Sequence, residues 1–279
     1  MPDIQVRGVQ HYYEWIKSSP TVGNQPVMVF LHGWGGSSRY WQSTAQALTG
    51  KFDCLLYDLR GFGRSAAQTS TGASLSYELE EYAEDLAALL DALQLQRVYL
   101  NGHSMGASIV TLFLNRYPER VEKAILTCSG IFEYDEPAFN AFHQFGGYVV
   151  KFRPSWLAKI PFADKIFMAR FLHRPLPRAD SLSFLEDFLQ ADYGAALGTI
   201  FTSVCQKATE VMPVEFAKLS VPTLLVAGER DIIIPAEMGR QAAALNEGVQ
   251  FVEVAQTAHF PMLEDAQTYR QLVADFVGI

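Results

Sequence analysis

Short apolar runs alternate with amphipathic stretches along most of this chain. Continuous apolar runs of strand length recur at 27–31, 54–59, 98–100, 124–127, 223–227 and 249–254. Runs of this kind are typical of strands that are buried on both faces of a parallel sheet. Helix-like segments lie between them, and the clearest covers residues 75–93, where leucines recur on one helical face. The pattern predicts the α/β class, with a mostly parallel central sheet flanked by helices.

Two regions depart from this alternation. Residues 4–16 alternate apolar and polar positions, which predicts a short antiparallel hairpin. Residues 131–218 contain no strand-like run but hold twelve of the 19 phenylalanines, some at helical spacings such as 139/142 and 184/188. We therefore expect an α/β core formed by residues 1–130 and 219–279, with residues 131–218 inserted as a helical cap. Some phenylalanines would form the cap's own core, and others would line an apolar cleft beneath it.

Composition and charge narrow the class of protein. The 279 residues are 49% hydrophobic and 19% charged, which fits a globular protein with a sizeable core. The net charge of −8 argues against nucleic acid as a partner, because binding phosphates requires a basic face. No apolar run approaches the length of a membrane span, and the N-terminus resembles no signal peptide. We expect a cytoplasmic protein without an integral membrane segment, whose three distant cysteines are free thiols.

A serine flanked by glycines follows the apolar run 98–100, in the string Gly102-His103-Ser104-Met105-Gly106. Residues 107–117 after it have the pattern of a helix that ends at a proline. A strand, a tight turn with a central serine, and a helix form the context that a nucleophile elbow requires. Only small neighbours let the strand and the helix approach closely around such a strained turn. We therefore predict Ser104 as the nucleophile of an acyl transfer.

An acyl-transfer serine needs a base and an acid that orients the base. His259 lies a few residues after the last predicted strand and is the only histidine beyond residue 173. Asp231 follows the strand predicted at 223–227, and the neighbouring carboxylate Glu229 is its rival. The order of serine, acid and histidine along the chain is one of the known orders of such triads. We predict Ser104, Asp231 and His259 as catalytic residues.

The developing oxyanion needs two backbone N–H donors. One is expected from Met105, immediately after the nucleophile, and the other from Trp34 in the glycine-rich loop 32–37 that follows the strand predicted at 27–31. His32 is expected to stabilise this loop. The indole of Trp34 either walls the acyl pocket or packs under the cap.

With these segments in view, the chain resembles the α/β-hydrolase fold superfamily, in its cap-bearing, esterase-like branch. The resemblance implies the triad Ser104, His259 and Asp231, with oxyanion donors at Trp34 and Met105. One departure is Ala258, because the family usually has glycine before the histidine. The matching strings span most of the chain: His32-Gly33-Trp34-Gly35-Gly36-Ser37, Asp58-Leu59-Arg60-Gly61-Phe62-Gly63-Arg64-Ser65, Gly102-His103-Ser104-Met105-Gly106, Gly228-x-x-Asp231-x-x-x-Pro235 and Ala258-His259-Phe260-Pro261.

Other motifs do not point to a cofactor or a metal. Residues 61–66 match a dinucleotide fingerprint, but a Ser/Thr/Gly-rich loop at 66–74 follows where the fingerprint needs a helix. Asp58 and Arg60 are expected to brace this turn by hydrogen bonds. The remaining histidines show no metal-ligand spacing with a carboxylate or cysteine cluster: His11, His32, His103, His143 and His173.

The reaction that these residues predict is hydrolysis of a carboxylic ester, and the phenylalanine-rich cap favours a small, lipophilic substrate as the partner. A thioester would use the same groups. A C–C bond hydrolase is the rival enzyme, and it would need a cation for the substrate carboxylate, for which the cap offers Arg153, Arg170, Arg174 and Arg178. A ligand-binding sensor with slow turnover is the alternative from another class. A serine nucleophile argues against dehalogenase or epoxide hydrolase chemistry, where relatives on this fold use aspartate.

Overall fold

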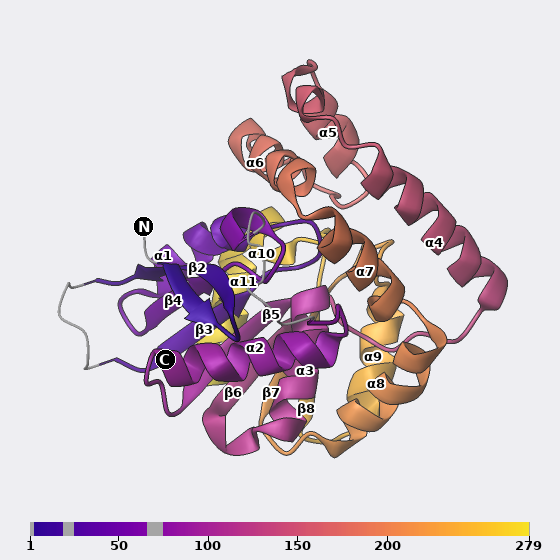
Figure 1. Cartoon of the computed structure of the whole chain (residues 1–279). Coiled ribbons are helices and arrows are strands. Elements are labelled where there is room, and N and C mark those ends of the chain that lie inside the picture. Colours follow the sequence, from indigo (N-terminus) through magenta and orange to yellow (C-terminus); the bar gives the residue numbers. More distant parts are fainter. Residues whose placement is uncertain (1–2, 19–24, 66–74, 279) are drawn as a thin grey trace.

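The computed structural model of the chain describes residues 3–18, 25–65 and 75–278. In these residues, eight strands form one sheet in the order β1-β2-β4-β3-β5-β6-β7-β8, with helices on both faces (Figure 1). The mostly parallel central sheet flanked by helices that the sequence predicts is confirmed. The strands are β1 (Asp3–Val6), β2 (Val9–Ile16), β3 (Val27–Leu31), β4 (Asp53–Tyr57), β5 (Val98–His103), β6 (Val121–Thr127), β7 (Thr223–Gly228) and β8 (Val249–Val254).

Within the sheet, only β2 runs opposite to the other strands. β1 and β2 form the antiparallel hairpin predicted for residues 4–16, and β2 also pairs antiparallel with β4. Every other neighbouring pair, from β4 to β8, is parallel. Parallel strands place their carboxyl ends at one edge of the sheet, so the loops that follow β3, β5, β7 and β8 meet there.

Successive residues of each central strand point into two different cores. Val29 and Leu31 of β3 pack with α2 (Leu79–Ala92) and α3 (Met105–Arg116) on one face. Met28 and Phe30 pack with α1 (Gln42–Leu48) and α11 (Ala266–Val277) on the other face. Since successive side chains of a strand alternate between faces, a run that is apolar at every position must be covered on both. The uninterrupted apolar runs of the sequence follow from this three-layer arrangement.

Five helices and a short 3-10 helix lie between β6 and β7, where the sequence predicts the cap. They are α4 (Glu136–Lys151), η4 (Ser155–Lys159), α5 (Ala163–Met168), α6 (Arg178–Gln190), α7 (Tyr193–Ser203) and α8 (Gln206–Lys218). α7 contacts α2, and α8 contacts α3 and α9 (Ala236–Ala244). α6 contacts two short 3-10 helices in the loops of the sheet, η1 (Ser38–Trp41) and η2 (Gly63–Ser65). Figure 1 shows α4, α5 and α6 projecting from the body of the molecule.

Element boundaries differ from the sequence prediction at three points. The helix predicted from residue 75 begins at Leu79, because the Arg60 guanidinium binds the Ser76 carbonyl (3.0 Å) and Glu78 is extended. The strand predicted at 54–59 ends at Tyr57, and the next backbone N–H, that of Asp58, donates to Tyr12 of β2. The helix predicted at 107–117 begins two residues earlier.

The dinucleotide-like string is partly visible. The serine- and threonine-rich loop at 66–74, on which its rejection rests, lies outside the described residues. Asp58 braces the turn as expected, since its carboxylate accepts from the backbone N–H groups of Ser38 (2.8 Å) and Arg64 (2.9 Å). Arg60 instead binds Asp85 of α2 (2.8 Å).

Among the described helices, none is both long enough and apolar enough to cross a membrane.

Candidate active site

Ser104 stands at a sharp turn between β5 and α3. Its backbone has φ 53° and ψ −120°, a strained conformation for a residue with a side chain. Glycine is required on both sides: a Cβ on Gly102 would lie 2.6 Å from the Gly106 carbonyl oxygen, and one on Gly106 would lie 2.6 Å from the His32 carbonyl oxygen. The turn is anchored by the Ser104 N–H, which donates to the Thr127 carbonyl at the end of β6 (2.8 Å). The hydroxyl is thus presented at the carboxyl edge of the sheet.

A continuous hydrogen-bonded chain connects Ser104, His259 and Asp231. The Ser104 Oγ lies 3.1 Å from His259 Nε2, and His259 Nδ1 lies 2.7 Å from Asp231 Oδ2. The other carboxylate oxygen of Asp231 accepts from the N–H groups of Ile233 (2.8 Å) and Ile234 (3.1 Å). Both His259 and Asp231 are buried. A carboxylate held by two N–H groups fixes the imidazole so that Nδ1 carries the proton and Nε2 faces the serine.

Glu229, the rival acid, is directed elsewhere. Its Oε2 accepts from the backbone N–H of Gln256 (2.7 Å), and its Oε1 pairs with Arg230 (3.2 Å). The bond from Gln256, with the Arg230 charge as a further cause, lowers the pKa of Glu229. The structure therefore brings Asp231, and not Glu229, to His259.

The loop after β3 lies against the serine turn. A Cβ on Gly33 would lie 3.0 Å from His103 Nδ1 and 3.1 Å from Ser104 Cβ, so only glycine allows this approach without displacement. In the described part of the chain, no carbonyl acceptor is recorded for the backbone N–H of Trp34 or of Met105. Met105 is the first residue of α3, where an N–H has no partner within the helix. Among the described residues, both N–H groups thus remain able to donate to a bound group, and their role as oxyanion donors stays a prediction.

The side chains of His32 and Trp34 hold this loop. His32 Nε2 accepts from the Leu59 N–H (2.9 Å), and Nδ1 lies 2.8 Å from the Gly33 carbonyl oxygen. Burial lowers the pKa of His32, so the ring is neutral. The Trp34 indole N–H donates to the Ala196 carbonyl of α7 (2.9 Å). The indole thus ties the loop to the helical segment between β6 and β7.

Tyr40 and His103 form a second polar chain that sequence reasoning missed. The Gly33 N–H donates to the Tyr40 hydroxyl (2.5 Å), which lies 2.9 Å from His103 Nδ1. His103 Nε2 lies 2.7 Å from the His259 carbonyl oxygen, so Nε2 carries the proton and Nδ1 accepts from the tyrosine. Burial, with the proximity of His259 as a smaller cause, holds the pKa of His103 well below its usual value. Neutral His103 therefore links the loop after β3 to the backbone of His259.

Glu264 was also missed. It follows the histidine loop in the short helix α10 (Pro261–Glu264), and its carboxylate is buried. One oxygen accepts from the N–H of Ala258 (2.9 Å) and of Phe260 (3.3 Å), on either side of His259. The other accepts from the N–H groups of His173 and Arg174, both at 2.7 Å. No motif marks this residue, because its partners are backbone groups as much as 91 positions away.

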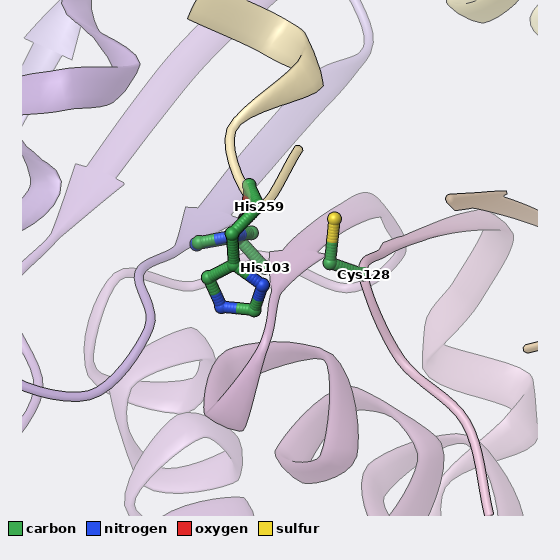
Figure 2. Close-up of side chains that lie close together, drawn as sticks. All are labelled: His103, Cys128 and His259. Atoms are coloured by element: carbon green, nitrogen blue, oxygen red, sulfur yellow. Dashed lines mark hydrogen bonds between the residues drawn. The ribbon is translucent and has the colours of Figure 1, made fainter. Parts of the chain in front are cut away.

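His103, Cys128 and His259 converge from three separate segments (Figure 2). Their potential ligand atoms lie within 4.8 Å of one another, although their sequence spacing gives no such indication. Each ring nitrogen of the two histidines already has a hydrogen-bond partner. Burial raises the pKa of the Cys128 thiol well above its usual value, which opposes the thiolate that a metal needs. The cluster is therefore explained by the hydrogen bonds that position His259.

Aromatic side chains from α5, α6 and the loop between them cover this site. Phe171 lies 6.1 Å from the His259 ring, centroid to centroid, and its carbonyl accepts from the His259 N–H (2.9 Å). Phe184 packs on Phe260 (5.2 Å), and Phe188 packs on Trp34 (5.4 Å). The surroundings of Ser104 on this side are apolar, as the phenylalanine count suggests.

The four arginines that the sequence assigns to the predicted cap either bind groups outside the triad or are exposed. Arg153 donates to the carbonyls of Phe188 and Ala191, and Arg174 binds Asp265 (3.2 Å). Arg170 and Arg178 are exposed. Among the described residues, none of the four therefore binds Ser104, Asp231 or His259.

Comparisons with known proteins agree with the fold. A family model described as alpha/beta hydrolase fold matches residues 26–266. The chain is 27% identical over 259 residues to the putative carbamate hydrolase RutD of Pseudomonas savastanoi pv. phaseolicola, covering 91% of this chain and 94% of that protein. It is 25% identical over 260 residues to the pimeloyl-[acyl-carrier protein] methyl ester esterase of Aeromonas hydrophila, covering 92% and 97%. The solved structure of the enol-lactonase from Burkholderia xenovorans LB400 matches all of both chains with a TM-score of 0.80 at 20% identity.

Proposed function

Because the chain belongs to the alpha/beta hydrolase fold family, we propose that it is a serine hydrolase that cleaves a carboxylic ester with an apolar acyl or alcohol group. The observation that carries the proposal is the hydrogen-bonded chain from Ser104 Oγ through His259 to Asp231, with distances of 3.1 and 2.7 Å. A relative that bears the name of a methyl ester esterase supports the choice of bond. The aromatic cover of the site supports an apolar substrate.

In this mechanism, His259 Nε2 takes the hydroxyl proton as Ser104 Oγ attacks the ester carbonyl. The N–H groups of Trp34 and Met105 bind the oxyanion, and loss of one such donor typically costs about 3–4 kcal/mol of transition-state stabilisation. His259 returns the proton to the leaving alcohol, and the acyl group remains on Ser104. His259 then takes a proton from water as the water attacks the acyl-enzyme, and it gives that proton to Ser104 Oγ as the bond to the acyl group breaks and the acid leaves. Asp231 keeps Nδ1 protonated and stabilises the imidazolium.

The helical segment 131–218 would act as the cap of this site. α5 and α6 carry the phenylalanines that lie over His259 and Trp34, so they would contact the acyl or alcohol group. In this proposal the sheet supplies the reacting groups, and the helical segment sets the size of the substrate.

The test is hydrolysis of p-nitrophenyl esters of increasing chain length, combined with a fluorophosphonate label read by intact mass. We expect turnover with an optimum beyond the shortest chain, and one label on Ser104. Labelling without turnover would contradict the ester proposal and favour a thioester, a C–C bond substrate or a sensor that turns over slowly. If the protein shows no labelling and no turnover, the whole mechanism is contradicted.

Substitutions assign the roles. Ser104→Ala and His259→Gln should each lower kcat by about a thousandfold or more, because triad members act as a unit. Asp231→Asn should lower kcat strongly and Glu229→Gln only slightly, since only Asp231 contacts the imidazole. The opposite order for the two acids would show that the acid is Glu229.

A further inference from the structure

The segment 151–178, which we call the distal segment, exposes large apolar side chains to solvent. It contains η4 and α5 and joins α4 to α6. Ile166 is 76% exposed, Phe152 68% and Phe162 64%. Trp156 and Ile160 are also exposed. Burying these side chains in an apolar medium would be favourable, so a cluster of this kind indicates an interaction surface.

The distal segment is strongly basic in an acidic protein. It carries seven lysines and arginines and a single acid, the buried Asp164. The rest of the chain then has 15 basic and 29 acidic residues, out of totals of 22 and 30. Among the described residues, none of the exposed cations of this segment makes an ion pair: Lys151, Lys159, Lys165, Arg170 and Arg178. The Lys165 ammonium instead lies 5.6 Å from the centre of the Phe162 ring.

The distal segment lies away from the sheet but next to the candidate active site. Figure 1 shows α5 at the far end of α4, at the edge of the molecule. Ile166 of α5 faces solvent, whereas the next residue, Phe167, packs on Phe188 (4.9 Å). Phe171, just after α5, contacts His259. The exposed apolar surface is thus separated from His259 by one short helix and the turn after it.

We propose that the distal segment docks the protein on an anionic lipid surface. Tryptophan, phenylalanine and isoleucine side chains enter the boundary between headgroups and acyl chains, and the lysines and arginines around them pair with lipid phosphates. The acidic remainder of the molecule is repelled by the same surface, so the segment is the part that faces the membrane. This proposal is independent of the reaction assigned to Ser104.

Charge favours a lipid surface over a second copy of this chain. A symmetric dimer through the distal segment would place the same patch of each copy against the other. The unpaired cations of both copies would then face one another, which is unfavourable in an interface from which water is excluded. An anionic membrane supplies both the apolar medium and the opposite charge.

The experiment is co-sedimentation of the full chain with vesicles of phosphatidylcholine, alone or mixed in equal parts with phosphatidylglycerol. We expect binding to the mixed vesicles only, and we expect added salt to weaken it because salt screens the charges. Lys159→Glu with Lys165→Glu should lower the partition coefficient roughly tenfold or more. Trp156→Ser with Phe162→Ser should lower it by a similar factor through loss of buried apolar area.

Matched controls carry the same changes elsewhere on the surface. Lys51→Glu with Lys218→Glu reverses two exposed cations that have no ion-pair partner among the described residues, and Val214→Ser with Leu245→Ser removes two exposed apolar side chains. Both control variants should bind like the parent. All four variants should keep the far-UV circular dichroism of the parent, which shows that they are folded.

Three outcomes would overturn the proposal. One is that the parent chain does not bind the mixed vesicles, and another is that the control variants lose binding as much as the distal ones. The third is that the parent binds no vesicles but is a dimer by light scattering, and that the variant Trp156→Ser with Phe162→Ser is a monomer. None of these readouts uses turnover, so they are separate from the tests of the hydrolase mechanism.

Discussion

At the scale of single residues, Tyr40 and His103 determine how three segments meet around Ser104. The hydroxyl of Tyr40 connects the Gly33 N–H to His103, and His103 connects onward to the His259 carbonyl. His103 is fully buried and neutral, so both ends of its ring are fixed by these bonds. Neither residue contacts the reacting atoms in the mechanism proposed above. They are positioning residues for the oxyanion loop and for the base.

Tyr40→Phe tests this positioning role. The change leaves the Gly33 N–H without an acceptor and His103 Nδ1 without a donor, which should cost about 1–3 kcal/mol of stability. Because the oxyanion loop and the base would both shift, we expect kcat for the best p-nitrophenyl ester to fall about tenfold or more, with KM little changed.

The control for that substitution is Tyr82→Phe. Tyr82 is also buried, and its hydroxyl donates to the Arg60 carbonyl (3.1 Å) instead of to a residue of the candidate active site. It should lose stability but keep kcat. Equal losses of kcat in both variants would mean that Tyr40 acts only through stability.

At the scale of elements, Glu264 joins the loop that carries His259 to the segment that follows α5. Its two oxygens accept four backbone N–H bonds, two from each segment. A carboxylate is suited to this place because it offers acceptors only. The same buried group therefore sets the position of His259 and the position of the helices above it.

Glu264→Gln should reduce stability and activity far more than its small change of shape suggests. The amide NH₂ would face two backbone N–H groups, so two hydrogen bonds are lost and donors oppose donors. We expect the free energy of unfolding to fall by about 1–3 kcal/mol, measured by urea titration, together with a lower kcat. Glu247→Gln, at an exposed position, is the control and should change neither. An unchanged unfolding midpoint for Glu264→Gln would contradict this account.

The sheet and the order of the candidate triad could be predicted from sequence because they depend on local patterns. Buried parallel strands require unbroken apolar runs, and the turn at Ser104 requires its flanking glycines. Tyr40 and Glu264 could not be predicted, because each acts through backbone groups that only the fold brings near. The start of α2 at Leu79 was missed for the same reason, since Arg60 binds the carbonyl that would otherwise begin the helix. The cap boundaries at 131 and 218 stay a prediction.

At the scale of the whole molecule, buried histidines make stability depend on pH. Burial lowers the pKa of His11 from 6.5 to about 4, and it also lowers the pKa values of His32 and His103. These rings are neutral in the folded chain, whereas in the unfolded chain they take a proton near the ordinary value. The unfolded state therefore binds more protons once the pH falls below about 6.5. For His11, stability is lost as the pH falls from 6.5 to about 4.

His11→Gln should reduce this acid sensitivity. The full pKa shift of His11 lowers the free energy of unfolding by about 3 kcal/mol at the acid end of the range. The variant should have a lower Tm at neutral pH, because the stacked contact with Tyr57 is lost, but its Tm should fall less steeply on acidification. His173→Gln, at an exposed ring, is the control and should follow the parent. Parallel Tm curves for His11→Gln and the parent would contradict the assignment.

The chain leaves the sheet after β6 and returns at β7, and these two strands are neighbours. Thr127 at the end of β6 pairs with Val226, and Thr223 at the start of β7 pairs with Ala124, so both ends of the long excursion are fixed by the same pair of strands, at opposite edges of the sheet. Lengthening a loop whose ends are already fixed costs little, because closure entropy grows only with the logarithm of length. Changes of length in the part of the excursion that projects from the body, such as α4, should therefore leave Ser104, Asp231 and His259 in place, whereas residues 171–174, which bind His259 and Glu264, must be kept. In directed evolution, new substrate preferences should be sought in this excursion and hydrolytic rate in the sheet loops.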